Sequence, residues 1–272
     1  MSAAPRSQSP LASWRVVRFG AIDSTNEEAR CRARAGDAGR LWIVAEEQSA
    51  GRGRRGRSWV SLKGNLFASA LIIDPCLPAI AAQLGFVAGV ALARAAVDVG
   101  VAEVGLKWPN DLLFNGAKCA GLLVEGLSLS DGRLACIIGV GVNCARAPGD
   151  LDHPTAFLTD RRGKAVAPSE LFQRLIARFD EALGEWRAGG AFERIRSAWL
   201  DRAAGLGGPI RIDDAGGRRE GVFEGLDADG RLLFRGERGV EAVESAELWI
   251  LPAPDSPPIA APSDPLAREG RV

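Results

Sequence analysis

Residues 51–57 read Gly-Arg-Gly-Arg-Arg-Gly-Arg and lie between two apolar runs, residues 41–45 and 66–73. Glycine permits tight backbone turns that a side chain would forbid. The forked guanidinium of arginine suits the oxygens of carboxylates and phosphates. The segment therefore predicts a loop that folds around an anionic ligand. A solvated basic hairpin or a nucleic-acid patch explains the same residues, because a charge run is more often a solvated or polyanion-binding surface.

The overall charge balance argues that this positive charge is local. Among 272 residues there are 34 Lys+Arg and 34 Asp+Glu, so the whole chain is not a polyanion binder by bulk charge. The composition is 47% hydrophobic and 25% charged, as in soluble globular proteins, and the length allows one large domain or a domain plus a small one. A nucleic-acid-binding protein remains an alternative, although no aromatic residues alternate with the arginines.

Cysteine and histidine usage excludes several other classes. The five cysteines form no C-x-x-C pair and are odd in number, which favours a reducing cytoplasm over a disulfide framework. His153 is the single histidine, next to a proline in a loop-like stretch, so neither a histidine base nor a multi-histidine metal site is expected. The N-terminus does not resemble a signal peptide, and the apolar stretch 84–93 is too short to span a bilayer. We therefore expect a cytoplasmic protein that is not in a membrane.

Two hydroxyl residues stand where a helix is expected to begin. Ser24 with Glu27, or Thr25 with Glu28, matches the capping box, in which a hydroxyl and a carboxylate satisfy free amides at a helix start. Such a helix start is also a good place to hold a polar ligand group.

Two further stretches break regular structure in ways that suit a site. Pro109 removes a backbone donor and makes the residue before it extended, so Lys107, Asn110 and Asp111 are predicted to meet at a rigid corner. Residues 112–124 are typical of a hairpin. The strand expected at 135–143 contains two glycines, which usually mark a bulge or a ligand close to the backbone.

The pattern of elements predicts an α+β fold. Strands are expected at 14–19, 41–45, 66–73, 112–114, 118–124 and 135–143, and helices at 78–97, 169–186 and 192–199. After residue 205, short strands at 210–212, 221–226, 231–234 and 240–243 are typical of a small all-β barrel. The expected division is a flexible tail (1–13), a catalytic domain with a mixed sheet packed with helices (14–205), the barrel (206–251) and a disordered tail (252–272). Neither the P-loop nor the Rossmann motif has its required context.

Together these motifs resemble the biotin–protein ligases. Five segments match in order: Ser24-Thr25-Asn26, residues 47–50 leading into the glycine-arginine loop, residues 107–111, Lys118-x-Ala-Gly-x-Leu-x-Glu, and Gly139-x-Gly-x-Asn143. The resemblance covers about residues 14–250 and implies that the barrel is SH3-like. It implies that biotin and ATP form biotinyl-5′-AMP, with Mg²⁺, and that the biotinyl group passes to a specific lysine of a biotin carboxyl carrier protein.

The resemblance also implies a role for each matching residue. Lys118, Arg52 and Arg54 would be catalytic, with Lys118 reaching both the biotin carboxylate and the α-phosphate. The biotin-binding residues would be Ser24, Thr25, Gln48, Gly51, Arg52, Lys118, Gly121 and Gly139. The nucleotide-binding residues would be Arg54, Arg55, Trp59, Lys107, Asn110, Asp111 and Asn143. The arginine loop would close over the adenylate and exclude water.

Several of these assignments have a plain structural alternative. Trp59 fits an adenine-stacking position and a core tryptophan equally well. Asp111 fits a Mg²⁺ ligand, but one carboxylate is weak evidence for a metal and could simply cap a turn. Cys119, inside the lysine motif, is interpreted as a small buried hydrophobe.

The sequence also departs from the family pattern. The lead-in before Trp14 is too short for an N-terminal DNA-binding domain, so no DNA partner is expected. The barrel end, residues 245–250, lacks the expected Gly-Asp and terminal basic residue, so no ATP or acceptor contact is assigned to it. A lipoate or octanoate ligase or transferase of the same superfamily is the main alternative, although those relatives lack the dense glycine-arginine loop. Both a monomer and a homodimer remain open.

Overall fold

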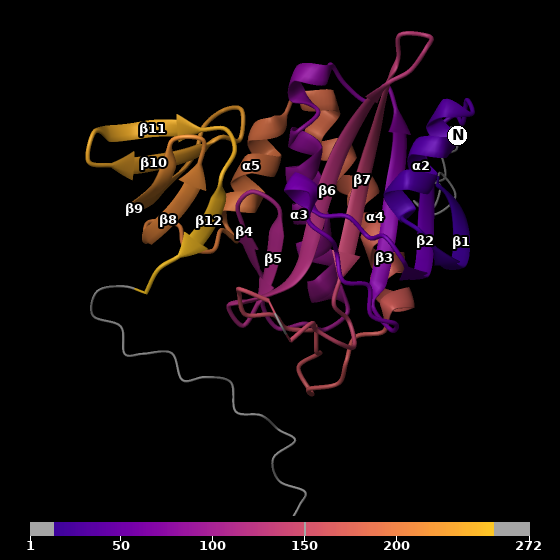
Figure 1. Ribbon diagram of the computed structural model, residues 1–272, viewed down its shortest axis with the longest axis horizontal. Helices are drawn as coiled ribbons and strands as arrows, with labels where there is room; N and C mark the ends of the chain where they lie inside the picture. The colour runs from indigo at the N-terminus through magenta and orange to yellow at the C-terminus, as the bar shows by residue number, and fades with distance from the viewer. Residues whose placement is uncertain (1–13, 150, 253–272) are drawn as a thin grey trace, which may run out of the picture.

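The computed structural model describes residues 14–149 and 151–252, which form a seven-stranded sheet covered by helices and a second, five-stranded sheet (Figure 1). The two tails predicted from the sequence, 1–13 and 252–272, fall outside the described residues except for Pro252. No helix in the described part of the chain is long and apolar enough to cross a membrane.

The large sheet has the order β1-β2-β3-β7-β6-β5-β4. Its strands are β1 (Arg15–Ile22), β2 (Leu41–Gln48), β3 (Leu66–Ile73), β4 (Gly105–Lys107), β5 (Asp111–Phe114), β6 (Ala117–Ser128) and β7 (Leu134–Val142). Only β1 and β2 pair in parallel, across the helix α2 (Thr25–Arg34), and the other pairs are antiparallel. The mixed sheet predicted from the sequence is confirmed.

Two hydrophobic clusters hold helices to opposite faces of this sheet. Successive residues of a strand point to opposite faces, and β7 follows this rule. Its Cys136 and Ile138 belong to the cluster that includes α3 (Gln83–Asp98), α4 (Pro168–Trp186) and α5 (Phe192–Leu200). Its Ala135 and Ile137 belong to the cluster that includes α2. The sheet is therefore buried on both faces, and α2 lies on the opposite face from α3 and α4 (Figure 1).

Two element boundaries differ from the sequence predictions. β2 continues through Gln48, three residues past its predicted end, because its backbone stays in register with β1 (Gln48 opposite Ile22) although Glu46 and Glu47 are polar. The helix predicted at 78–97 is a short 3₁₀ turn, η2 (Pro78–Ile80), followed by α3. Residues 78–82 are exposed or half-buried, and complete burial begins at Gln83, so the apolar contacts that support an α-helix start there.

The second sheet has the order β11-β10-β9-β8-β12 and is entirely antiparallel, as predicted for a small all-β unit. Its strands are β8 (Pro209–Asp214), β9 (Gly217–Leu226), β10 (Leu232–Gly236), β11 (Gly239–Val243) and β12 (Glu247–Ile250). It packs on the first unit through a shared core, and the Trp108 indole N–H donates to the Gly230 carbonyl at 3.1 Å. The exact division at residue 205 stays a prediction.

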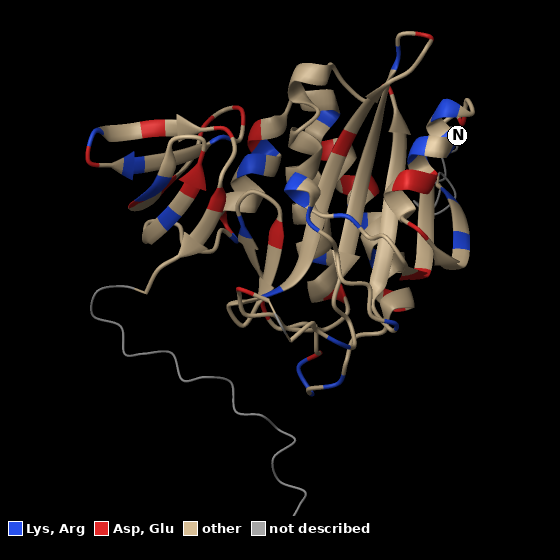
Figure 2. Cartoon of the chain, viewed as in Figure 1, with Lys and Arg blue, Asp and Glu red and all other residues tan. Residues whose placement is uncertain are grey.

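Charged side chains of both signs are spread over the helices, the loops and the second sheet (Figure 2). The central strands β3 and β7 carry no charged residue at all. This mixture of signs along the chain agrees with the neutral balance of the sequence. The four arginines of the glycine-arginine loop are therefore a local concentration of positive charge that needs its own explanation.

Candidate active site

One cavity brings together most of the residues that the sequence selected. Its walls come from the start of α2, the end of β2, the glycine-arginine loop, β6, β7, the segment after β7 and β12. The predicted site residues that line it are Ser24, Thr25, Gln48, Arg52, Arg54, Trp59, Asn110, Asp111, Lys118, Gly121, Gly139 and Asn143. Gly51, Arg55 and Lys107 are not among the lining residues but contact residues that are: Gly51 pairs with Trp59, Arg55 lies 3.9 Å from Glu247, and Lys107 lies 3.6 Å from Asp111. The roles predicted for all of these residues stay proposals.

The start of α2 forms a polar wall of the cavity. Ser24 is the N-cap, and its hydroxyl accepts from the Glu27 amide at 3.4 Å. In the predicted capping box, the Glu27 carboxylate would accept from the Ser24 amide. In the structure the Ser24 amide donates to the Asp23 carboxylate instead, at 2.6 Å. Both the amide and the hydroxyl of Thr25 donate to Gln48 Oε1, at 2.9 and 3.1 Å. Hydrogen bonds within the chain hold these polar groups in fixed orientations, as a selective polar subsite requires.

Asn26 completes this wall, although the sequence analysis gave it no role. It is buried, its Oδ1 accepts from Ser69 Oγ at 2.5 Å, and its Nδ2 donates to Glu125 at 2.7 Å. A Cβ atom added at Gly139 would overlap Asn26 Oδ1. Glycine at position 139 therefore lets β7 pass directly against the start of α2.

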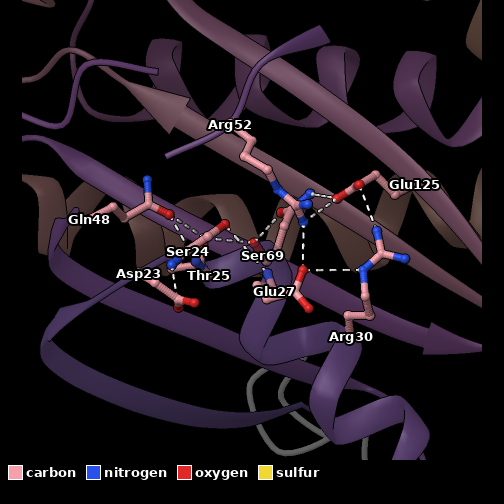
Figure 3. A network of polar contacts seen from close by, with 10 residues as sticks. Asp23, Ser24, Thr25, Glu27, Arg30, Gln48, Arg52, Ser69 and Glu125 are labelled. Carbon is pink, nitrogen blue, oxygen red and sulfur yellow. Dashed lines mark hydrogen bonds and ion pairs between the residues drawn. The ribbon is translucent and has the colours of Figure 1, made fainter. Parts of the chain in front are cut away.

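The glycine-arginine loop is folded down onto α2 and β6 by Arg52 (Figure 3). Nη2 of Arg52 lies 3.1 Å from Glu27 and 3.4 Å from Glu125. Glu125 also binds Arg30 at 2.7 Å, so one carboxylate connects the loop to the helix. Within the loop, the Gly53 amide donates to the Arg57 carbonyl at 2.7 Å. These partly exposed ion pairs are individually weak, so the loop is held in place lightly.

Replacing Glu125 with alanine is expected to loosen the loop, although Arg52 keeps its ion pair with Glu27. The change removes one ion pair to Arg52 and its connection to α2, worth about 0.2–1 kcal/mol per pair. Trypsin cleavage at the arginines of residues 52–57 should become about three- to tenfold faster, and biotin with ATP should slow it. The matched control is Glu28→Ala, because Glu28 pairs with Arg32 on α2 and does not contact the loop. Equal cleavage with and without ligands in the wild type would contradict a lid.

The second sheet also reaches this loop. Arg54 donates to Asn110 at 3.2 Å and to Ser245 at 3.1 Å, and Arg57 lies 3.0 Å from Glu247. Burial lowers the pKa of Arg54, while nearby Glu247 opposes that shift. The sequence analysis assigned no site contact to residues 245–250, yet Glu247 lines the cavity. No local pattern predicts this contact, because it depends on how the second sheet packs.

Lys118 lies in the cavity beside a buried carboxylate. Its Nζ is 2.7 Å from Asp111 Oδ1, and Nζ of Lys107 is 3.6 Å from the other oxygen of the same carboxylate. The β5–β6 pairing, with Asp111 opposite Gly121, brings these residues together. The corner predicted around Pro109 is therefore the feature that places a carboxylate against Lys118. This ion pair fixes the position of the Lys118 ammonium inside the cavity.

The indole of Trp59 forms a wall of the cavity. A Cβ at Gly121 would lie 2.8 Å from its Cζ3, and a Cβ at Gly141 would lie 2.5 Å from its Cε2, so both glycines leave space for the ring. Lys118 Nζ lies 5.8 Å from the ring centroid. The indole Nε1 is buried and has no hydrogen-bond partner among the described residues. A buried donor of this kind usually has a partner, so the ring fits the wall of a ligand site better than a completed core.

Comparison with known proteins places this cavity in a family. The model of the biotin/lipoate A/B protein ligase family matches residues 21–143. A biotin–[acetyl-CoA-carboxylase] ligase of Paracoccus denitrificans is 42% identical over 236 residues, which cover 84% of this chain and 97% of that protein. This chain belongs to the biotin protein ligases of that family.

Solved ligase structures share the fold. A biotin protein ligase from Aquifex aeolicus in complex with biotin and ATP is 26% identical, with a TM-score of 0.74 over 87% of this chain and 99% of that chain. A Leishmania major biotin protein ligase in complex with biotinyl-5-AMP is 25% identical, with a TM-score of 0.58 over 85% of this chain and 99% of that chain. The α+β class with an SH3-like second unit, predicted from the sequence, is confirmed.

The ligase resemblance implied Mg²⁺ with Asp111 as a ligand, and the surroundings of Asp111 do not favour that role. In the described part of the chain, no group of three or more His, Cys, Asp or Glu side chains could hold a metal ion. Both oxygens of Asp111 already face lysine ammonium groups. Mg²⁺ in such enzymes is typically held by one or two carboxylates with water and substrate phosphates. No catalytic step is assigned to a metal held by this carboxylate.

His153 is a cavity residue that the sequence analysis missed. The segment after β7 pairs with β6: the Lys118 amide donates to the Pro154 carbonyl, and the Ala156 amide donates to the Lys118 carbonyl, both at 2.9 Å. This pairing places His153 on the wall of the cavity that Lys118 also lines. Burial, and next Lys118, lower the pKa of His153 below its usual value. A lone histidine next to proline gives no sequence signal for such a position.

Proposed function

We propose that this chain is a biotin–protein ligase that joins biotin to ATP and then transfers the biotinyl group to a lysine of a biotin carboxyl carrier protein. The observation that carries this proposal is the convergence of Lys118, Arg52 and Arg54 on one cavity with glycine-lined strands. The name of the Paracoccus relative and the biotin, ATP and adenylate in the two solved ligases support it.

The first step joins two anions, so the residues that catalyse it must supply positive charge. A carboxylate oxygen of biotin attacks the α-phosphorus, a new O–P bond forms, and the bond to pyrophosphate breaks. Catalysis of phosphoryl transfer is mainly positioning and charge stabilisation. Lys118 and Arg54 supply positive charge inside the cavity. Mg²⁺ carried by the nucleotide would neutralise the phosphates further.

The second step transfers the acyl group. The acceptor ε-amine attacks the carbonyl carbon of the mixed anhydride, the amide bond forms, and AMP leaves. Because water also attacks mixed anhydrides, the adenylate must be shielded. The loop that Arg52 holds against α2 and β6 is the part of the chain that provides this shield.

The cavity has two chemically different ends. Around Thr25 and Gln48, fixed hydroxyl and amide groups suit the ureido ring of biotin. Around Trp59, Asn110 and Asn143, an aromatic ring and side-chain amides suit the nucleotide. Lys118, on β6, lines the same cavity and is the residue that we assign to the junction of the biotin carboxylate and the α-phosphate.

A transfer assay tests the proposal and its alternatives together. The protein is mixed with Mg-ATP, a biotin carboxyl carrier domain and either biotin, lipoate or octanoate. We expect a mass increase of one biotinyl group on one carrier lysine, with biotin only. An increase with lipoate or octanoate but not biotin would favour the acyl-ligase alternative. No increase, with salt-sensitive oligonucleotide binding instead, would favour the nucleic-acid alternative.

A further inference from the structure

We propose that His153 accepts the proton that the acceptor lysine must lose before it attacks the adenylate. This inference rests on the proposed function and concerns its second step. It assigns a role to a cavity residue that adenylate formation does not need.

The transfer step requires a base because the incoming nucleophile is protonated. A lysine ammonium has a pKa of about 10.4, so roughly one molecule in 2,500 carries a free amine at pH 7. One proton must pass from the ammonium to a base before the lone pair can form the C–N bond. As the C–O bond to AMP breaks, the nitrogen loses its second proton to solvent and becomes an amide. General bases accelerate such steps by about 10²–10⁴-fold.

Among the described residues that line the cavity, three side chains could accept this proton: Asp111, Glu247 and His153. Asp111 is held by Lys118 at 2.7 Å and by Lys107 at 3.6 Å. Glu247 is held by guanidinium groups, the nearer at 3.0 Å. A carboxylate held by cations is a poor proton acceptor because protonation breaks its ion pairs. No hydrogen bond or ion pair occupies the His153 imidazole among the described contacts.

The surroundings of His153 keep it in the form that can accept a proton. Burial disfavours the imidazolium, and so do three neighbouring cations, Lys118, Lys107 and Arg57, whereas Asp111 favours it. Together, burial and these charges lower the pKa of His153 below its usual value of about 6.5, so the imidazole is neutral at pH 7. The same cations help it release the proton to solvent after transfer. Pairing of residues 154–156 with the Lys118 backbone fixes the place of His153 in the cavity.

The pH dependence of transfer by His153→Gln separates this role from a structural one. In single-turnover transfer from preformed adenylate, the wild-type rate should be flat above about pH 7. The variant should be about 10²-fold slower at pH 7, and its rate should rise tenfold per pH unit as free amine appears. Adenylate formation, measured by pyrophosphate exchange, should fall far less than transfer. Hydroxylamine, which is unprotonated at pH 7, should cleave the bound adenylate at similar rates in both proteins.

The matched control is Asp152→Asn, because Asp152 is an exposed neighbour that does not line the cavity. It should keep the flat transfer profile. If His153→Gln forms adenylate and transfers with the wild-type rate and profile, the role of His153 is overturned. A hydroxylamine rate as depressed as the lysine rate would also overturn it, since the defect would then not concern proton removal. If the wild-type protein forms no adenylate, the proposed function fails first, and this role with it.

Discussion

Lys118→Ala is expected to lower the rate of adenylate formation by about 10²–10³-fold, the usual effect of removing one group that stabilises transition-state charge. The Lys118 ammonium lies in the cavity, 2.7 Å from Asp111. Without it, two negatively charged substrates would meet next to a carboxylate whose remaining ion pair among the described residues is with Lys107, at 3.6 Å. Pyrophosphate exchange with biotin and ATP measures the effect directly. Lys118→Arg should recover part of the rate, because it restores charge but not shape.

A surface lysine provides the control for loss of charge alone. The Lys63 side chain is 70% exposed and lies 3.7 Å from Glu47, so Lys63→Ala should leave exchange almost unchanged. Because Lys118→Ala leaves a buried carboxylate less well paired, its melting temperature should be measured alongside. If Lys118→Ala keeps its fold and exchanges pyrophosphate at the wild-type rate, Lys118 is not the catalytic lysine.

Gly139→Ala is the second substitution with a large expected effect. The new Cβ would overlap Asn26 Oδ1, which cannot easily move because Ser69 and Glu125 both hold the Asn26 amide. Overpacking of this kind costs roughly 1–3 kcal/mol. Moving Asn26 away from the new methyl group would displace the start of α2, which carries Thr25. Biotin binding, measured by calorimetry, should weaken by about 10- to 100-fold, which is the same range of free energy.

A second glycine of the same sheet supplies the matched control. In β6, a Cβ at Gly126 would meet only Leu134 Cδ1, at 3.6 Å, an ordinary van der Waals contact. Gly126→Ala should therefore bind biotin normally. Equal affinities for the wild type and Gly139→Ala would show that the start of α2 does not form the biotin subsite.

The local hydrophobic pattern and the turn residues predicted most strands and turns of the sheet, because each of these elements depends on a short stretch of sequence. β3 spans the predicted residues 66–73, since eight consecutive apolar or small residues suit a strand buried on both faces. The turn at residues 115–116 joins β5 to β6 as the Asn-Gly pair predicts. The motif order then selected most residues of the cavity, because the motifs lie at the start of α2, at the ends of β2 and β4, and on β6 and β7, which all line or adjoin it.

The parts that the sequence did not predict depend on contacts between distant segments. Glu247 reaches the loop only because the second sheet packs beside β4 and α5. His153 enters the cavity through backbone pairing of an irregular segment with β6. Gly141 had a visible signal as a strand glycine, but the Trp59 ring that it accommodates is 82 positions earlier. The sequence analysis assigned no role to His153 or Glu247, and only the tertiary structure showed which residues they and Gly141 contact.

The measurement that tests the central claim most directly is identification of the bound intermediate. The protein is mixed with biotin and α-labelled ATP without a carrier, denatured rapidly, and the released small molecules are identified. The account predicts one biotinyl-5′-AMP per active site and one pyrophosphate released, with both appearing about 10²–10³-fold more slowly in Lys118→Ala. Absence of the adenylate in the wild-type protein, or an adenylate formed with lipoate but not with biotin, would contradict it.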